Sequence, residues 1–226
     1  FQQSRQYMFG ANVRLSPSTT VDVQGYYKDL SSIVIPSDRL VQRGGITQTE
    51  NFSNGGFGFS RGIELLVRQE LARGLFGWIS YTLSQSRQKP AEGEAVTNFP
   101  FDQRHNLFLV ISQKLPRDWT IGGSLRYTTG DWHTPIANAI YDSDGDVYQP
   151  IAGLRYSQRL PDFFELDCRI DKRWVYERWS FGVYLDVRNV TNRRNIELFQ
   201  YGYDYHQRVD VPGLPIFPNL GLRGEF

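Results

Sequence analysis

The stretch Leu220-Gly221-Leu222-Arg223-Gly224-Glu225-Phe226 ends the chain, and its pattern governs the interpretation of everything before it. Leu220, Leu222 and Phe226 share one face of an extended strand, while the other face carries a glycine, an arginine and a glutamate, because successive side chains of a strand point to opposite faces. A last strand with one apolar face and a final aromatic residue is typical of a transmembrane β-barrel, whose closing strand places that aromatic at the membrane interface. The pattern therefore predicts an all-β chain whose strands cross a membrane.

The same two-faced alternation recurs through the whole chain, with apolar residues at every second position and polar or charged residues between them. Aromatic residues stand at the ends of these apolar runs, as they do in the interfacial girdles of membrane barrels. The predicted strands are Gln6–Leu15, Thr20–Leu30, Arg61–Glu70, Leu75–Gln85, Gln103–Leu115, Trp119–Thr129, Phe164–Trp174, Trp179–Val190 and Ile216–Phe226.

Composition agrees with a sheet that has one apolar and one wet face. Aromatic residues make up 15% of the 226 residues, although the mean hydropathy of −0.45 marks a polar chain. No run of about 18 apolar residues exists, which excludes a helical membrane protein.

The net charge of +1 gives no general electrostatic case for binding nucleic acid. Cys168 is the single cysteine, and its apolar neighbours Leu166 and Ile170 favour a small hydrophobic role.

The connections between the predicted strands alternate between short and long, as periplasmic turns and extracellular loops do in outer-membrane barrels. The short ones are Ser16–Thr19, Leu71–Gly74, Pro116–Asp118 and Val175–Arg178. The long ones are Ser31–Ser60, Ser86–Asp102, Gly130–Phe163 and Thr191–Pro215. Within the last loop, Ile196–Tyr203 and Gln207–Val211 are expected to form a hairpin above the membrane.

The number of strands bears on how much of a barrel this chain provides. Nine strands place the two termini on opposite sides of the membrane, with the last strand running toward the periplasm. Bacterial single-chain barrels have even strand counts. We therefore expect residues 1–226 to be the C-terminal portion of one larger barrel domain.

Two other architectures remain open at this point. A complete small outer-membrane barrel, acting as an adhesin or a rim protease, would pair the first strand, Gln6–Leu15, with the last, Ile216–Phe226. A soluble β-sandwich used as a binding module would also show alternating strands, but it would cover its apolar face with a second sheet. The dense mixture of positive and negative charges on the polar face favours a water-filled lumen over a sandwich.

Several short stretches add a likeness to a known family. They are Ser60-Arg61-Gly62-Ile63-Glu64-Leu65, Gly77-Trp78-Ile79-Ser80-Tyr81-Thr82-Leu83-Ser84, Phe101-Asp102-Gln103-Arg104-His105-Asn106-Leu107, Tyr184-Leu185-Asp186-Val187-Arg188-Asn189-Val190-Thr191-Asn192-Arg193 and the closing Leu220 to Phe226. In their order and spacing, over about residues 55–226, the chain resembles the C-terminal barrel region of TonB-dependent outer-membrane receptors.

This resemblance implies a barrel of about 22 strands around a plug, located in the outer membrane of a Gram-negative bacterium. It implies energised uptake of a scarce nutrient: a siderophore, a vitamin, an oligosaccharide or a peptide. The implied partners are outer-membrane lipid and lipopolysaccharide, the ligand, and the TonB complex acting through a plug that this chain does not include. The barrel-insertion machinery is a further implied partner, and Leu220, Leu222 and Phe226 would form its recognition signal.

No catalytic constellation is visible, so we expect a protein that is not an enzyme. His105, His133 and His206 lack the spacing of a Ser–His–Asp triad or a metal triad. No cofactor is expected, with one reservation for calcium. Asp142, Asp144 and Asp146 alternate in the way that hard cations favour, but they match a calcium-loop pattern poorly, and the sequence favours an ordinary turn-rich loop.

The candidate ligand contacts are an arginine beside a wall strand and aromatic residues of the long loops. Aromatic loop residues can stack on a ligand and hold its polar groups through their hydroxyls, although they can also pack on one another. The candidates are Arg104, Trp132, Tyr141, Tyr201 and Tyr203.

Overall fold

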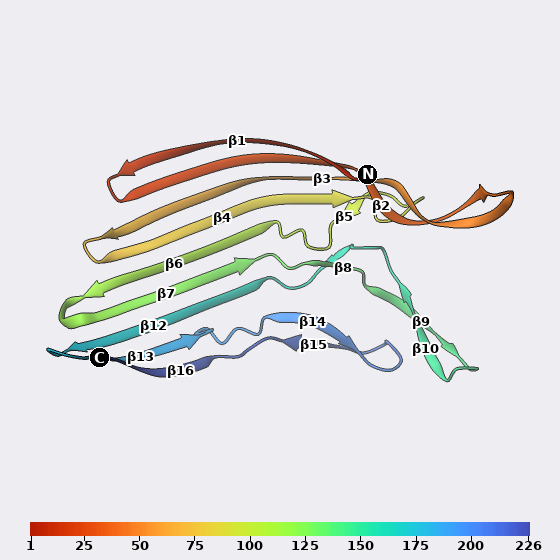
Figure 1. Ribbon diagram of the computed structural model, residues 1–226. Coiled ribbons are helices and arrows are strands. Elements are labelled where there is room, and N and C mark those ends of the chain that lie inside the picture. Colours follow the sequence, from red (N-terminus) through yellow and green to blue (C-terminus); the bar gives the residue numbers. More distant parts are fainter.

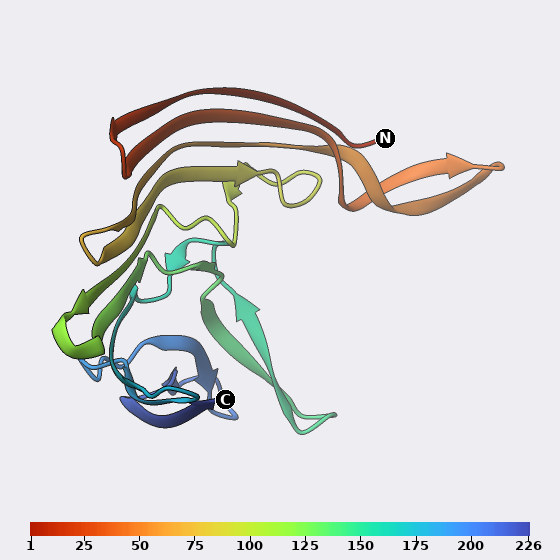
Figure 2. The same ribbon diagram turned by 60° about the vertical axis from the view of Figure 1, so that its left-hand side comes forward.

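The computed structural model describes residues 1–226 as a single-layered antiparallel sheet that curls along its width (Figures 1 and 2). Nine strands pair in chain order, and the short β5 (Thr97–Asn98) adds to the edge of one of them. The nine are β1 (Gln3–Ser16), β2 (Thr19–Arg43), β3 (Ile46–Ala72), β4 (Leu75–Gln88), β6 (His105–Leu115), β7 (Trp119–Thr128), β12 (Phe163–Val175), β13 (Ser180–Arg188) and β16 (Phe217–Glu225). All nine predicted wall strands are confirmed.

The pairing register keeps the apolar residues of neighbouring strands on one face of the sheet. Leu125 of β7 lies opposite Leu109 of β6 and Leu166 of β12. On the other face, Asp186 of β13 lies opposite Asn219 of β16. We call these the apolar face and the polar face.

Nothing within the chain covers the apolar face. Ile35 is the only large apolar side chain that is buried. Wall residues such as Ile121 remain 48% exposed. A soluble protein rarely leaves so large an apolar surface in water, so this face requires an apolar surrounding. The sandwich alternative is wrong, because the structure has one sheet layer where a sandwich needs two (Figure 2).

The complete small barrel is also contradicted. It required β1 to pair with β16, but these two strands are the opposite edges of the sheet and have no pairing with each other. Figure 2 shows the result as a curled strip whose first and last strands lie apart.

The two ends of the sheet differ in their connections (Figure 1). The tight turns β1–β2, β3–β4, β6–β7 and β12–β13 gather at one end together with the C-terminus, and the N-terminus lies at the other end with the long connections. We call these the short-turn end and the long-loop end. The β6–β7 turn is the 3-10 turn η1 (Pro116–Asp118), in which Arg117 has a φ of 62°. No helical segment has the length and hydropathy needed to cross a membrane.

One connection differs from the expectation. The segment predicted as the loop Ser31–Ser60 is mostly strand, because β2 and β3 continue as a long hairpin that turns at Gly44 and Gly45 (Figure 1). Both glycines have positive φ, 61° and 81°, which a two-residue turn of this kind requires. The sequence pattern missed it because register shifts near Ser31 and Ser37 interrupt the alternation.

The other long connections carry small sheets of their own. The loop between β7 and β12 holds β8 (Trp132–His133) paired with β11 (Gln158–Arg159), and β9 (Ile136–Asp142) paired with β10 (Val147–Ala152). The last loop forms a separate hairpin of β14 (Ile196–Tyr201) and β15 (Arg208–Pro212). The predicted hairpin outside the wall is therefore confirmed.

Candidate functional site

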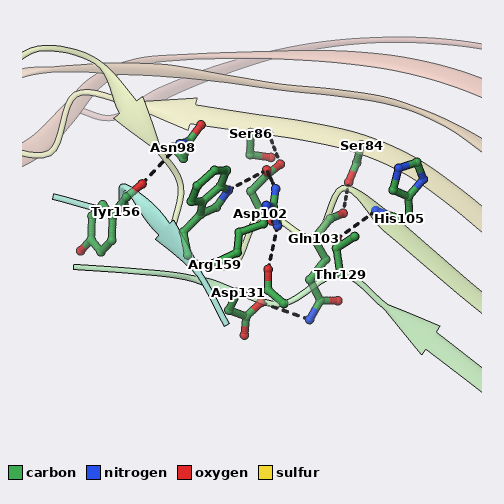
Figure 3. Close-up of polar contacts among 12 residues, drawn as sticks. Ser84, Ser86, Asn98, Asp102, Gln103, His105, Thr129, Asp131, Tyr156 and Arg159 are labelled. Atoms are coloured by element: carbon green, nitrogen blue, oxygen red, sulfur yellow. Dashed lines mark hydrogen bonds and ion pairs between the residues drawn. The ribbon is translucent and has the colours of Figure 1, made fainter. Parts of the chain in front are cut away.

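The most buried charged group of the chain lies at the long-loop end, at Asp102 (Figure 3). Its carboxylate accepts a hydrogen bond from the Ser86 backbone N–H at 2.6 Å and one from the Trp132 indole N–H at 3.2 Å. Arg159 completes the group, with Nη2 2.9 Å from Asp102 Oδ2. The Arg159 Nη1 also donates to the carbonyls of Asp102 and Gly130, each at 2.7 Å. We call Ser86, Asp102, Gly130, Trp132 and Arg159 the Asp102 clasp.

The Asp102 clasp joins two long connections to each other. Asp102 belongs to the connection after β4, whereas Trp132 and Arg159 belong to the connection after β7. The Arg159 guanidinium stacks on the Trp132 ring at 4.2 Å from its centroid. A buried ion pair whose hydrogen bonds are satisfied holds its elements in one arrangement, since separating it leaves a charge without a partner.

Weaker contacts continue the clasp toward the wall (Figure 3). Gln103 donates to Asp131 Oδ1 at 3.2 Å, and the His105 N–H donates to Thr129 Oγ1 at 3.1 Å. The Asn98 amide donates to the Tyr156 carbonyl at 3.3 Å. The first two bonds lie at the long-loop ends of β6 and β7, and the third joins the two long connections to each other.

A tyrosine cluster forms where the β9–β10 hairpin meets the turn of β14–β15. The rings of Tyr141 and Tyr148 are 5.1 Å apart, and those of Tyr148 and Tyr203 are 5.5 Å apart in an edge-to-face arrangement. The Tyr141 hydroxyl donates to Asp146 Oδ1 at 2.8 Å, and the Tyr203 hydroxyl donates to the Asp146 carbonyl. We call Tyr141, Asp146, Tyr148 and Tyr203 the tyrosine cluster.

Parts of this cluster face outward. Tyr141 is 48% exposed and Tyr203 is 64% exposed, so both rings offer surface to a bound molecule. The hydrogen bond to Asp146 raises the pKa of Tyr141 above its ordinary value. Because the Tyr141 and Tyr203 hydroxyls donate their protons to Asp146, the cluster can stack on a ligand and accept hydrogen bonds from its polar groups.

The predicted ligand contacts divide between different places. Tyr141 and Tyr203 meet in the tyrosine cluster. Trp132 instead uses its indole N–H and one ring face within the clasp. Arg104 lines a separate pocket, which it shares with Ser84 on the neighbouring strand, and Tyr201 packs near Tyr205 at 6.1 Å.

Other contributors were absent from the prediction. Asp102 stands in the stretch Phe101-Asp102-Gln103 that carried the family resemblance, but no sequence signal assigned it a partner. Arg159 is not identified by the sequence, and Asp146 is named there only as a candidate calcium ligand, because their roles depend on contacts between different loops.

The calcium hypothesis gains no support from the geometry. Asp142 accepts the backbone N–H groups of Asp144 and Gly145 at 3.1 and 3.4 Å, as in an ordinary turn. Asp146 is used by the tyrosine cluster. No group of three or more potential metal ligands converges in the structure.

Charges on the polar face form a connected group at the short-turn end. Glu225 of β16 pairs with Arg173 of β12 at 2.7 Å and with Arg223 at 2.6 Å. Arg169 pairs with Asp171 two residues further along the same strand. The polar face therefore carries mixed, partly paired charges in the way that a water-filled lumen does.

An aromatic stack links the two loop sheets near the tyrosine cluster. The His133 ring of β8 meets Phe199 of β14 edge to face at 5.0 Å, and the Arg208 guanidinium of β15 lies 3.9 Å from the Phe199 centroid. Both ring nitrogens of His133 are buried without a hydrogen-bond partner. Desolvation, and after it the positive charge of Arg208, lower the pKa of His133 below 6.5.

We expect this packing to weaken in acid. The pKa of His133 is lower in the folded protein than in the unfolded chain, so the unfolded chain binds the proton more readily. The stability that neutral His133 contributes is therefore fully present above pH 6.5 and is lost as the pH falls below that value. Hydrogen exchange of residues 196–212, corrected for intrinsic rates, should accelerate between pH 8 and pH 5. His133→Phe should abolish this acceleration and His206→Gln should not. An equal response in His133→Phe would assign the effect to another group.

Comparison with known proteins gives two different outcomes. No protein-family model matches the sequence, and no curated protein matches it. Solved structures do match. The ferric-catecholate import receptor Fiu of E. coli K12 has a TM-score of 0.65 at 16% identity, over 99% of this chain and 27% of that one.

Two further structures give the same result. The pyoverdine outer membrane receptor FpvA of Pseudomonas aeruginosa PAO1 matches with a TM-score of 0.65 and 17% identity, over 100% of this chain and 30% of that one. The iron transporter FrpB of Neisseria meningitidis matches with a TM-score of 0.60 and 16% identity, over 99% of this chain and 31% of that one. This chain thus spans less than a third of the length of each of them.

These findings define the class of fold. The chain has the fold of a barrel wall in outer-membrane receptors and transporters, which confirms the all-β barrel prediction. More particularly, the matching structures are TonB-dependent receptors, so the resemblance predicted from the sequence is confirmed. They are receptors and transporters rather than enzymes.

Proposed function

We propose that this chain is the C-terminal part of the barrel of a TonB-dependent outer-membrane receptor that takes up a scarce nutrient. The observation that carries the proposal is the uncovered apolar face, continuous across neighbouring strands and backed by a charged polar face. Such a sheet suits a wall with lipid on one side and a water-filled lumen on the other. The long-loop end would then face the cell exterior and the short-turn end the periplasm.

The tyrosine cluster is the ligand contact that the geometry supports best. It combines exposed rings with hydroxyl oxygens that can accept hydrogen bonds, and the hairpin β9–β10 and the β14–β15 turn hold it from two sides. Among siderophores, vitamins, oligosaccharides and peptides, ferric siderophores are favoured, because matching structures include a ferric-catecholate import receptor and a receptor bound to pyoverdine. Aromatic siderophore groups can stack on tyrosine rings.

The remaining partners follow from the same proposal. Lipid and lipopolysaccharide would surround the apolar face. The insertion machinery would read the apolar face of β16 and Phe226, whose side chain is fully exposed. The TonB complex would act through a plug outside this chain.

The uptake proposal is tested on the complete gene product in its host. Deleting the gene should abolish uptake of radioactive iron supplied as one member of a panel of ferric catecholate, hydroxamate and pyoverdine siderophores, and a plasmid copy should restore it. Normal uptake of the whole panel in the deletion strain would remove ferric siderophores as the substrate. Binding of cobalamin and oligosaccharides would then test the other nutrients.

A single substitution tests the tyrosine cluster. Tyr203→Ala should weaken binding of the transported ferric siderophore about 2- to 13-fold, because one aromatic pair contributes about 0.5–1.5 kcal/mol. Isothermal titration of the purified complete protein measures the change. Tyr176→Ala is the matched control, since Tyr176 stacks on Trp179 at the short-turn end. Equal affinities for Tyr203→Ala and Tyr176→Ala would place the ligand elsewhere.

A further inference from the structure

Lys172 occupies an unusual position on the apolar face. It lies in β12, opposite Trp119 of β7 and Val183 of β13. The side chains that share this face on β7, β12, β13 and β16 are aliphatic, aromatic, glycine, proline or cysteine, and Lys172 is the only charged residue among them. A lone cation on a lipid-facing wall needs a partner, because a charge in apolar surroundings is costly.

Two tryptophan rings flank the Lys172 ammonium group. Its Nζ lies 5.6 Å from the centroid of Trp119 and 5.4 Å from that of Trp174, within the range of cation–π attraction. Trp174 in turn stacks on Phe181 at 5.8 Å. Tryptophan rings collect at the boundary between hydrocarbon and headgroups. The arrangement therefore places the ammonium group at headgroup depth at the short-turn end.

The ammonium group keeps donors for another molecule. It has three N–H donors, and one of them is given to the Arg117 carbonyl in the turn η1. None of the ion pairs in the structure involves Lys172. The charge is thus held by two π-systems and a carbonyl, and it lacks an anionic partner within the chain.

We propose that Lys172, with Trp119 and Trp174, binds the phosphate of an anionic phospholipid in the leaflet at the short-turn end. The inference rests on the membrane placement in the proposed function, but it does not depend on the nutrient. Charge complementarity selects the occupant, since the net negative headgroup of an anionic lipid offsets the ammonium charge, which the choline cation of a zwitterionic lipid would repel, while the acyl chains cover the apolar face beside Ile121 and Ile170. The Trp119 and Trp174 rings would border the headgroup.

The test is native mass spectrometry of the complete protein in detergent micelles, titrated with phosphatidylglycerol or phosphatidylcholine. Lys172→Gln should lower the affinity for the first bound phosphatidylglycerol about 5-fold, because one lysine near an anionic lipid contributes about 1 kcal/mol of binding free energy, which corresponds to that factor. Affinity for phosphatidylcholine should not change, and Lys172→Arg should retain phosphatidylglycerol. Lys114→Gln is the matched control, because Lys114 lies opposite Thr120 at nearly the same depth but on the polar face.

Several results would overturn the proposal. One is that Lys172→Gln binds phosphatidylglycerol as tightly as Lys114→Gln does. Another is that Lys172→Gln weakens the binding of phosphatidylglycerol and of phosphatidylcholine by the same factor. Heat-dependent electrophoretic mobility verifies that each variant is folded. If Lys172→Gln fails to fold, Trp119→Leu serves instead, and it should weaken phosphatidylglycerol binding while the cation remains. Iron uptake is measured in parallel, so lipid affinities of Lys172→Gln that stay unchanged together with normal uptake would reject this site and leave the proposed function standing.

Discussion

Replacing Leu125 by arginine is expected to remove the protein from the outer membrane in which we propose that it lies. Leu125 lies near the middle of β7, between Leu109 and Leu166 on the apolar face. An arginine on the lipid face near the bilayer midplane costs about 2–4 kcal/mol. That is a large share of the roughly 5–15 kcal/mol by which proteins are stable. The folded fraction in isolated outer membranes, measured by heat-dependent electrophoretic mobility, should fall strongly.

The neighbouring residue provides the control for this substitution. Ser124 lies on the polar face, where its hydroxyl donates to Asp167 Oδ2 at 3.1 Å. Ser124→Arg would place the same charge beside a carboxylate in the lumen, so near-normal folded protein is expected. Similar losses for both variants would show that β7 tolerates no large side chain on either face, and the assignment of lipid to the apolar face would lose its support.

Removing the Asp102 carboxylate is expected to have the largest effect on the long-loop end. Asp102→Ala leaves the Arg159 guanidinium, whose side chain is 21% exposed, without its anionic partner. It also leaves the Ser86 N–H and the Trp132 indole N–H without an acceptor. Breaking a buried pair in this way costs about 3–5 kcal/mol. Hydrogen exchange of residues 130–160 should accelerate, and binding of the proposed ferric siderophore should weaken with it.

An exposed ion pair in the same loops shows whether the expected effect of Asp102→Ala comes from the burial of the pair or from its charge alone. Arg155 and Glu94 lie 3.0 Å apart with side chains 45% and 38% exposed. Surface pairs contribute about 0–1 kcal/mol, so Glu94→Ala should change hydrogen exchange little. Asp102→Asn should give an intermediate effect, because the amide oxygen can still accept one hydrogen bond while the charge is lost. Equal exchange in Asp102→Ala and Glu94→Ala would mean that the clasp does not hold the loops.

The limits of sequence-based prediction are visible in particular residues. The alternation predicts a loop over Ser31–Ser60, because interruptions near Ser31 and Ser37 hide the strands that lead to the turn at Gly44 and Gly45. Tyr141 and Tyr203 were chosen for their residue type and loop location, and they do meet in space. Trp132 was chosen on the same grounds, yet its indole is engaged by Asp102. Residue type cannot distinguish these two outcomes, because each depends on how separate loops dock.

The sequence by itself determined the wall: the strands, their two faces, the alternation of short and long connections, and the likeness to receptor barrels. A strand repeats its side-chain direction every second residue, so a local pattern suffices to assign its faces. Only the tertiary structure decided the contacts that join the loops, such as Asp102 with Arg159 and Asp146 with Tyr203. It also placed Lys172 between Trp119 and Trp174. These contacts join residues on different strands and loops, and their geometry depends on register and loop packing, which have no short-range period in the sequence.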